Sequence, residues 1–436
     1  MDAAAVLTDP AGVEIAQEAL TGSDIALIVV EDPRQALAFA ASLWFETAPQ
    51  TIVATTGTNG KTSVATFIRQ IWQILGLKAA NLGTTGVEGD FSAPLSHTTP
   101  EPITLHGLLA DMAEAGVTHA AMEASSHGLA QRRLDGVKLT AAAFTNFTQD
   151  HLDYHDSFDA YFAAKAGLFD RVLPEDGVAV INVDDPRGGD MEDIARARGQ
   201  SLLLVGRADR CDLRLVSQRF DAGGQDLRFE WEGKTHQVHL DLIGGFQAEN
   251  VLIAAGLAIG CDAPAGDVFQ ALPLLKTVPG RMQLAGTRQN GAAVYVDYAH
   301  TPDAVATALG ALRPHVMGRL VVVLGAGGDR DPGKRILMGQ AAAQGADVVF
   351  VTDDNPRTED PSVIRAAVME GAPQATEVAD RAEAILRGVD ALEPGDTLLI
   401  AGKGHETGQI IGSDVFPFDD VEQASVAVAA LDGAGL

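Results

Sequence analysis

From residue 51 onward, short runs of β-branched and apolar residues alternate with longer stretches in which apolar residues recur at helical spacing. This alternation predicts an α/β fold with parallel sheets. The expected strands are 51–55, 118–124, 139–145 and 177–183 in a first block, and 319–325, 346–352 and 396–402 in a second. The expected helices include 63–75, 158–172 and 244–260. Polar loops follow the strands, and open α/β sheets bind ligands outside the carboxyl ends of their strands.

Composition narrows the class of partner. The chain has 436 residues, of which 46% are hydrophobic, enough for two or three domains. Its formal charge of −28 is the opposite of what nucleic acid requires, so an anionic ligand would need local N–H groups and cations. Two cysteines without CxxC spacing, and no leader or membrane-length apolar run, predict a cytoplasmic protein with no membrane partner.

A connector rich in Pro and Gly, TVPGRMQ, separates the two blocks near residue 280. The first fifty residues hold a further strand-like stretch, 23–32, and a helix-like stretch, 34–46, which are too short to bury a core alone. We therefore expect three domains, comprising residues 1–50, 51–280 and 281–436.

The stretch from Thr55 to Thr62 lies between a β-branched strand and an amphipathic helix. It follows the phosphate-loop pattern G-x-x-x-x-G-K-[ST], except that Thr55 stands at the first glycine. Backbone amides and the helix N-terminus could then hold phosphate oxygens, with Lys61 on the terminal phosphates and Thr62 on Mg²⁺. The alternative is an ordinary turn between a strand and a helix.

The segment TGTNGKT, Thr56–Thr62, resembles the phosphate loop of the Mur ligase family and its folylpolyglutamate synthetase relatives. Further stretches carry the same resemblance: MEASSHGLAQRRL at 122–134, FTNFTQDHLDYH at 144–155, YFAAKAGLF at 161–169, VDYAHTPDA at 296–304 and AGKGHE at 401–406. The resemblance implies a P-loop-type central parallel-sheet ATPase domain plus a C-terminal Rossmann-like domain. It also implies a truncated N-terminal α/β fragment, because residues 1–50 match only the later part of the family's UDP-sugar-binding domain.

The resemblance also assigns roles to individual residues. Those implied for ATP are Gly57, Thr58, Asn59, Gly60, Lys61, Thr62, Ser63, Asn250, Arg281, Asp297 and His300. The implied metal set is Thr62, Glu123, His151 and Lys165 as a carbamate, and the implied catalytic residues are Lys61, Glu123, His151 and Lys165. Those implied for the UDP-sugar peptide are Thr98, Thr99, Ser125, Gln131 and Arg133.

These roles depend on the resemblance, because each residue also has an ordinary structural explanation. Glu123 could be a solvated carboxylate and His151 a turn histidine. Lys165 could be a surface lysine whose stem covers apolar groups. Its aromatic and apolar neighbours suggest partial desolvation instead, which favours the neutral amine that can add carbon dioxide.

The motif DDNPR, residues 353–357, bears on the choice of amino acid. In the family, D-N-P-R marks enzymes that add meso-diaminopimelate, whereas lysine-adding relatives lack the arginine. Diaminopimelate carries a second carboxylate that a guanidinium can bind with two hydrogen bonds. The residues alone also fit a turn. The implied amino-acid pocket comprises Arg330, Asp354, Asn355, Pro356, Arg357, Gly402 and Glu406.

The implied activity is ATP-dependent amide ligation in peptidoglycan precursor synthesis, by a monomer that uses ATP and Mg²⁺. An acyl phosphate would form on UDP-N-acetylmuramoyl-L-alanyl-D-glutamate, and the amine of meso-diaminopimelate would attack it. One alternative is a lysine-adding or folylpolyglutamate-type ligase, and another is a nucleotide-binding module without turnover. Arg357 opposes the first alternative, and the complete set of catalytic residues opposes the second.

Overall fold

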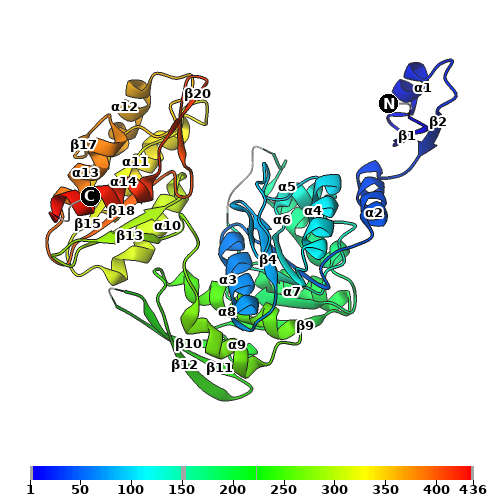
Figure 1. The fold of residues 1–436 in the computed structure, drawn as a ribbon, viewed down its shortest axis with the longest axis horizontal. Coiled ribbons are helices and arrows are strands. Elements are labelled where there is room, and N and C mark those ends of the chain that lie inside the picture. The colour runs from blue at the N-terminus through cyan, green and yellow to red at the C-terminus, as the bar shows by residue number, and fades with distance from the viewer. Residues whose placement is uncertain (1–2, 149–153, 222, 434–436) are drawn as a thin grey trace. The chain divides into compact units, whose positions relative to one another are not determined.

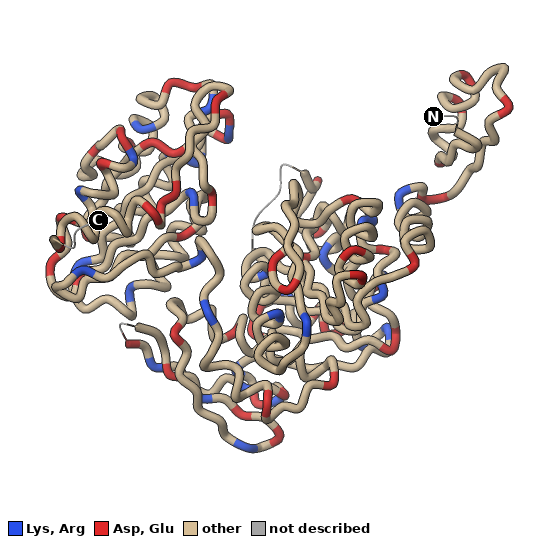
Figure 2. The backbone as a smooth tube through the Cα atoms, in the orientation of Figure 1, with Lys and Arg blue, Asp and Glu red and all other residues tan. Residues whose placement is uncertain are grey.

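The computed structural model of the protein describes residues 3–148, 154–221 and 223–433 (Figure 1). The chain forms two compact units. The first comprises Met1–Val216, Arg228–His236 and Ala248–Leu275, and the second Ser217–Leu227, Gln237–Gln247 and Lys276–Leu436. Acidic and basic residues are interspersed along both units (Figure 2). None of the helices that the structure describes has the length and apolar character needed to cross a membrane.

The largest sheet has ten strands in the order β12-β11-β10-β9-β8-β7-β3-β6-β4-β5. Their bounds are β3 (Thr51–Thr56), β4 (Ala79–Gly83), β5 (Gly86–Gly89), β6 (His119–Glu123), β7 (Ala141–Phe144), β8 (Val178–Asn182), β9 (Ser201–Gly206), β10 (Leu213–Phe220), β11 (Gln225–Trp231) and β12 (Lys234–Leu240). Neighbouring strands from β4 to β10 are parallel, whereas β5 is antiparallel to β4. The four strands predicted for the first block are confirmed, and they lie side by side in this parallel part.

Helices pack on this sheet through apolar side chains. Their bounds are α3 (Lys61–Ile74), α4 (Pro102–Glu114), α5 (Ser126–Ala130), α6 (Phe158–Gly167), α7 (Gly188–Ala197), α8 (Phe246–Gly260) and α9 (Ala265–Ala271). On α3, Phe67, Ile68 and Ile71 are fully buried, and the helix contacts β4 and β6. Each such side chain contributes roughly 1.5–3 kcal/mol to folding. The packing fixes the N-terminus of α3 next to the carboxyl end of β3.

The N-terminal segment contains β1 (Ala5–Thr8), α1 (Val13–Ala19), β2 (Ala26–Val29) and α2 (Pro33–Phe45). The two strands pair in parallel, and α1 has no buried residue. Asp32 caps α2 by accepting hydrogen bonds from the N–H groups of Arg34 and Gln35. Asp32 also pairs with Arg132. The α/β character expected here is present, and the division into three domains stays a prediction.

The second unit is built on a six-stranded sheet in the order β13-β14-β18-β15-β16-β17. The bounds are β13 (Gln283–Thr287), β14 (Ala293–Asp297), β15 (Leu320–Leu324), β16 (Val348–Val351), β17 (Thr376–Glu377) and β18 (Thr397–Ala401), with a separate hairpin of β19 (Gly408–Ile411) and β20 (Asp414–Pro417). All neighbouring pairs of this sheet are parallel except β13 and β14. The predicted strands of the second block are confirmed as β15, β16 and β18.

Helices cover both faces of the six-stranded sheet. They are α10 (Pro302–Leu312), α11 (Gly333–Gly345), α12 (Pro361–Gly371), α13 (Arg381–Asp390) and α14 (Asp420–Leu431). Val322 and Leu324 of β15 belong to the core under α10, α11 and α12, whereas Val321 and Val323 belong to the core under α13 and α14. Burial on both faces explains why β15 is uniformly apolar. The Rossmann-like arrangement expected for this part is confirmed.

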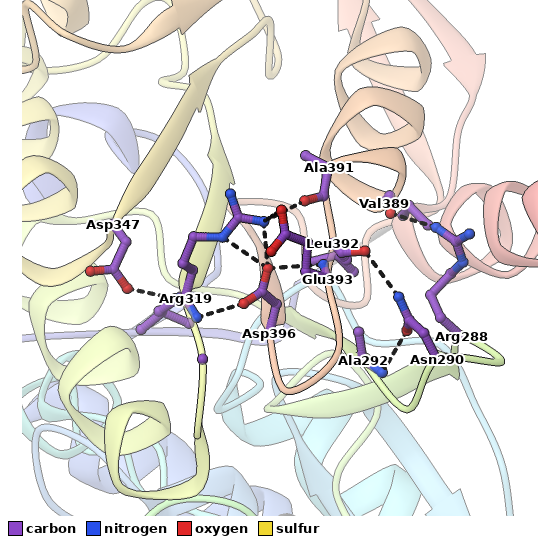
Figure 3. Close-up of polar contacts among 12 residues, drawn as sticks. Arg288, Asn290, Ala292, Arg319, Asp347, Val389, Ala391, Leu392, Glu393 and Asp396 are labelled. Atoms are coloured by element: carbon purple, nitrogen blue, oxygen red, sulfur yellow. Dashed lines mark hydrogen bonds and ion pairs between the residues drawn. The ribbon is translucent and has the colours of Figure 1, made fainter.

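A polar cluster ties together the amino ends of β15 and β18 (Figure 3). The Asp396 carboxylate accepts hydrogen bonds from the main-chain N–H and the guanidinium of Arg319 and from the N–H of Glu393, at 2.6–3.0 Å. Asp347 accepts from the N–H of Leu320 at 2.7 Å. Burial alone would raise the pKa of Asp396, but these hydrogen bonds lower it below its ordinary value. The charged form is therefore favoured at this end of the sheet.

Candidate functional site

The loop between β3 and α3 can be built only with glycine at two positions. A Cβ on Gly57 would lie 1.8 Å from the Thr145 hydroxyl oxygen, and one on Gly60 would lie 2.5 Å from Oδ1 of Asn250. Both glycines also have positive φ. Gly60 is the N-cap of α3 and has no side chain, so the first-turn N–H groups stay available to an anion.

The loop after β7 supports the loop before α3 through direct hydrogen bonds. The N–H of Thr58 donates to the Asn146 carbonyl, and the N–H of Asn59 donates to Oδ1 of Asn146, both at 2.9 Å. The Thr145 hydroxyl donates to the Asn59 carbonyl at 2.6 Å. Sequence reasoning missed Thr145 and Asn146, although both lie in a loop that follows a predicted strand. They fix the shape of the phosphate loop.

Two predicted catalytic lysines meet at one carbonyl oxygen of this loop. Lys61 Nζ donates to the carbonyls of Gly57 and Thr58, each at 2.9 Å. Lys165, on α6, donates to the same Gly57 carbonyl at 2.7 Å, and its Nζ lies 4.5 Å from the centre of the Tyr161 ring. The Lys165 side chain is 1% exposed. It is therefore buried beside the loop, rather than extended along the surface.

Glu123 ends β6, where its carboxylate is held rigidly. Its two oxygens accept from the N–H of Thr84 at 2.8 Å and from the Thr84 hydroxyl at 3.3 Å. A Cβ on Gly83 would lie 2.0 Å from Oε1, so the residue before Thr84 must be small. Thr84, which sequence reasoning missed, thus orients the carboxylate. Glu123 is 1% exposed, so it is not the solvated surface carboxylate that its sequence also allowed.

The described residues fit a Mg²⁺ ion that is held partly by a nucleotide. They contain no group of three or more His, Cys, Asp or Glu placed to hold a metal on their own, and His151 lies outside them. Mg²⁺ is commonly bound by one or two carboxylates together with substrate phosphates. Glu123, the Thr62 hydroxyl on the first turn of α3, and Lys165 as a carbamate are the described members of the metal set that the resemblance implies.

The residues predicted for the sugar-linked substrate lie together beside Glu123. The Thr99 hydroxyl donates to the Glu123 carbonyl at 2.8 Å and accepts from the N–H of Ser125 at 3.1 Å. Arg133 donates to the Thr99 carbonyl at 2.5 Å and, through Nε and Nη2, to Oε1 of Gln131.

Two hydroxyls of this set have structural partners. The Thr98 hydroxyl lies 3.2 Å from that of Thr84, and the Ser125 hydroxyl caps α5. A polar surface next to the phosphate loop is therefore preorganised.

In the second unit, the loops after β14, β16 and β18 converge. Asn355 is 4% exposed and donates from Nδ2 to Oε2 of Glu406 at 2.9 Å. The N–H of Gly402 donates to the Asp297 carbonyl at 3.1 Å, and Gly402 has φ 124°. A Cβ there would lie 2.4 Å from Oδ2 of Asp354. Two pairs of the predicted pocket are thus close together: Asn355 is hydrogen-bonded to Glu406, and Gly402 lies against Asp354.

Arg357 has an unusual backbone that the β19–β20 hairpin holds in place. Its φ is 51°, a left-handed value that is unfavourable for an arginine. Its N–H donates to the Ile410 carbonyl at 3.0 Å, and its carbonyl accepts from Gly412 at 2.7 Å. The guanidinium donates to the Gly328 carbonyl at 2.7 Å. Pro356 packs against Gly328, where a Cβ would lie 1.9 Å from the Pro356 carbonyl oxygen.

The remaining predicted residues of the second unit surround Tyr298. The Arg281 guanidinium lies 4.8 Å from its ring centre, and the rings of His300 and His405 lie 4.6 Å and 5.1 Å away. Asp297 accepts from the N–H groups of Met282 and Ala299, yet burial raises its pKa. Burial also raises the pKa of Tyr298 and lowers that of His405. Arg330, by contrast, is exposed.

Lys403 is a further residue of this unit that the sequence did not indicate. Its side chain is 0% exposed, and Nζ donates to Oδ1 of Asn355 and to the carbonyl of Gly408, both at 2.7 Å. Nζ also lies 3.7 Å from Glu406 and 3.9 Å from Asp354. Burial lowers the pKa of Lys403, although the neighbouring carboxylates oppose the shift. A lysine between two glycines gave no signal that it would be buried.

Comparison with known proteins identifies the family. A Mur ligase middle domain matches residues 55–258, and a Mur ligase glutamate ligase domain matches residues 280–404. The chain is 50% identical to the UDP-N-acetylmuramoyl-L-alanyl-D-glutamate--2,6-diaminopimelate ligase of Bradyrhizobium diazoefficiens, over 95% of this chain and 86% of that protein. The ligase of the same name from Caulobacter vibrioides is 49% identical, over 99% and 88%. The chain belongs to the Mur ligase family.

Solved structures agree with this Mur ligase assignment. A structure of UDP-N-acetylmuramoyl-L-alanyl-D-glutamate--2,6-diaminopimelate ligase is 34% identical, with a TM-score of 0.72 over 98% of this chain and 92% of that one. The folylpolyglutamate synthase of Mycobacterium tuberculosis, complexed with ADP, is 20% identical with a TM-score of 0.69 over 93% and 95%. At that identity the second comparison shows a shared fold only.

Proposed function

We propose that this Mur ligase uses ATP to join meso-diaminopimelate to UDP-N-acetylmuramoyl-L-alanyl-D-glutamate, as an ADP-forming ligase of peptidoglycan precursor synthesis. The observation that carries the proposal is the pocket in which Asn355 donates a hydrogen bond to Glu406. Arg357 follows Asn355 by two residues. A carboxylate suits an ammonium, and a guanidinium suits a carboxylate. The two curated relatives at about 50% identity bear the name of this activity.

The first step assigned to the chain is phosphoryl transfer from ATP to the terminal carboxylate of the dipeptide. Its barrier is lowered mainly by positioning and by charge neutralisation. The N–H groups at the start of α3 would bind the phosphates, and Lys61 would leave the loop carbonyls for the terminal phosphates. The carboxylate attacks the γ-phosphorus, the bond to the bridging oxygen breaks, and ADP leaves. An acyl phosphate on the dipeptide is the product.

The residues that would hold Mg²⁺ are Thr62 and Glu123, and His151 and Lys165 are proposed for a second ion. When bound, Mg²⁺ neutralises the charge that develops on the phosphates. Lys165 is proposed to act as a carbamate, formed when its neutral amine adds carbon dioxide and releases a proton. The support is the burial of Lys165 beside the phosphate loop. An NMR signal from ¹³C-bicarbonate on the wild type, lost in Lys165→Ala, would test this modification.

The second step assigned to the chain is attack of the diaminopimelate amine on the acyl phosphate. The tetrahedral intermediate collapses to an amide as phosphate leaves. The distal carboxylate is assigned to Asn355 and Arg357, and the distal ammonium to Glu406. Arg330, Asp354, Pro356 and Gly402 complete this proposed pocket. Arg281, Asp297, His300 and Asn250 are proposed to contact ATP.

The test is phosphate release from ATP in the presence of UDP-N-acetylmuramoyl-L-alanyl-D-glutamate, with meso-diaminopimelate, L-lysine or no amino acid. We expect release that depends on diaminopimelate, together with formation of the tripeptide product. Faster release with lysine would contradict the assignment of Arg357. ATP binding without release under any condition would contradict the ligase proposal and favour a nucleotide-binding module.

A further inference from the structure

The buried ammonium of Lys403 joins three segments at the carboxyl end of the six-stranded sheet. Lys403 follows β18, Asn355 follows β16, and Gly408 begins β19. The Lys403 side chain is completely buried and donates one 2.7 Å hydrogen bond to each of the other two segments. A buried ammonium is costly unless it is paired and hydrogen-bonded, and this one is both.

The bond from Lys403 is one of three that fix which way the Asn355 amide faces. Oδ1 of Asn355 accepts from Lys403 Nζ at 2.7 Å and from the N–H of Ile410 at 3.0 Å. With Oδ1 held by two donors, Nδ2 faces Glu406 and donates to it at 2.9 Å. The reverse orientation would place Nδ2 against two donors and Oδ1 against a carboxylate. An amide has two N–H groups, so Asn355 can donate to Glu406 and to one further acceptor.

The charges around Lys403 also suit an incoming cation. Asp354 and Glu406 lie within 4 Å of the ammonium, so two carboxylates share one buried positive charge. Arg381 and Asp420 form a fully buried ion pair nearby, and Arg381 also interacts electrostatically with Asp354 and Glu406. Within 4 Å of Lys403 Nζ, one positive charge therefore faces two negative ones. Two carboxylates close to a single ammonium leave one of them able to pair with the ammonium of an amino acid.

We propose that Lys403 is a positioning residue for the amino-acid substrate, which holds the Asn355 amide and the Glu406 carboxylate in the orientation that binds its distal group. This inference rests on the proposed function, because it assigns Asn355 and Glu406 to that group. It adds a residue that does not contact the substrate and acts through two that do.

The experiment compares steady-state kinetics of the wild type with those of Lys403→Met, which keeps the apolar stem and removes the ammonium. We expect KM for meso-diaminopimelate to rise about tenfold to a hundredfold, the range for losing a hydrogen bond to a charged group. The kcat and the KM for ATP should stay within about twofold, because the phosphate loop is built from other residues. Unchanged KM for diaminopimelate would overturn the proposal.

The matched control is Asp396→Asn, which removes the buried carboxylate of the polar cluster at the amino end of the same sheet (Figure 3). It should lower stability without changing KM for diaminopimelate. A purely structural lysine would behave like this control. An equal rise in KM for diaminopimelate in both variants would therefore count against a positioning role.

A double-mutant cycle with Asn355→Ala asks whether Lys403 acts through Asn355. If it does, the double variant should bind diaminopimelate no more weakly than Asn355→Ala alone, because the orientation of an absent amide no longer matters. Effects that multiply would contradict the mechanism.

A second variant covers the case in which Lys403→Met does not fold. Lys403→Gln retains an amide donor. If both variants fold, we expect the KM of Lys403→Gln for diaminopimelate to lie between the KM values of the wild type and Lys403→Met. If only Lys403→Gln folds, its KM should exceed that of the wild type. If neither variant folds, Lys403 serves the fold and the proposal is wrong. The wild-type measurement distinguishes failure of the proposed function from failure of the proposal for Lys403. A wild type without amino-acid-dependent phosphate release contradicts the proposed function itself, whereas an active wild type with an unaltered Lys403→Met contradicts only this one.

Discussion

The two ends of the six-stranded sheet both carry dense polar clusters, but the pKa values of their ionisable groups are shifted for different reasons. At the amino end, hydrogen bonds lower the pKa of Asp396 and of Asp347, so the charged forms are favoured. At the carboxyl end, burial lowers the pKa of Lys403 and raises that of Asp297, so the charged forms of these two groups are disfavoured. Burial alone would also lower the pKa of Arg381, but Asp420 and the neighbouring carboxylates raise it.

One cluster therefore stabilises the fold, and the other holds ionisable groups at a cost. Groups displaced toward their neutral forms gather preferentially at functional sites. The disfavoured charges on Lys403 and Asp297 agree with the proposal that the substrate pocket lies at the carboxyl end.

The largest effect should follow from removing a predicted substrate contact at the carboxyl end. Arg357→Ala should lower kcat/KM for meso-diaminopimelate roughly 100-fold or more, because a two-bond contact between guanidinium and carboxylate is lost. Arg319→Ala, at the amino end, should leave kcat/KM unchanged. Comparable losses in the two variants, measured by phosphate release, would remove the functional distinction between the ends.

A smaller and different effect is expected for the amino end. Asp396→Asn should lower the free energy of unfolding by about 1–3 kcal/mol, because Asp396 accepts four hydrogen bonds, two of them from a guanidinium. Denaturant unfolding at neutral pH measures this difference. If the variant is as stable as the wild type, this cluster does not have the stabilising role that its geometry indicates.

The pH dependence of that difference gives a finer test. The folded-state pKa of Asp396 lies below its ordinary value of about 3.9, so its contribution is present above that pH. The contribution is lost as the pH falls through the folded-state pKa. The stability gap between wild type and Asp396→Asn should therefore narrow under acid conditions. A gap of constant size down to low pH would mean that the charge on Asp396 contributes nothing.

The smallest effect on stability should appear at the carboxyl end under alkaline conditions, where the charged form of Lys403 is the disfavoured one. The folded-state pKa of Lys403 lies below its ordinary value of about 10.4, so the unfolded chain binds more protons between the two values. Wild-type stability relative to Lys403→Met should rise as the pH increases through this window, by an amount that thermal unfolding detects as a small shift in Tm. A relative fall would indicate that Asp354 and Glu406 outweigh the burial of Lys403.

The sequence predicted the parallel strands well because their residues are buried on both faces and so form uninterrupted apolar runs, as in β15. It did not predict β10, β11 and β12, or the β19–β20 hairpin. Those strands mix polar and exposed residues, and their periodicity is weak. Burial pattern does not explain every miss, because the largely buried strands β4, β9 and β14 were not predicted either.

A similar distinction separates the candidate site residues that the sequence indicated from those that it did not. Lys61, Glu123 and Arg357 lie in motifs whose residue types indicate chemistry directly. Thr84 and Lys403 act by holding another residue, and that role depends on contacts between loops far apart in the sequence. Neither composition nor spacing indicates such contacts. His151 lies outside the described residues, so its role stays a prediction.

The β19–β20 hairpin supports the pocket mainly through its main chain, with one side-chain hydrogen bond from Gln409 to the Asp354 carbonyl at 2.7 Å. The Ile410 N–H bonds Asn355, the Ile410 carbonyl and the Gly412 N–H bond Arg357, and the Gly408 carbonyl bonds Lys403. Evolution can therefore change most side chains of this hairpin freely while its length stays constrained. Among homologues that share the pocket, we expect substitutions to accumulate at exposed Val415 and Phe416, and insertions or deletions between 408 and 412 to be rare. In this hairpin, chain length should carry more selective constraint than residue identity.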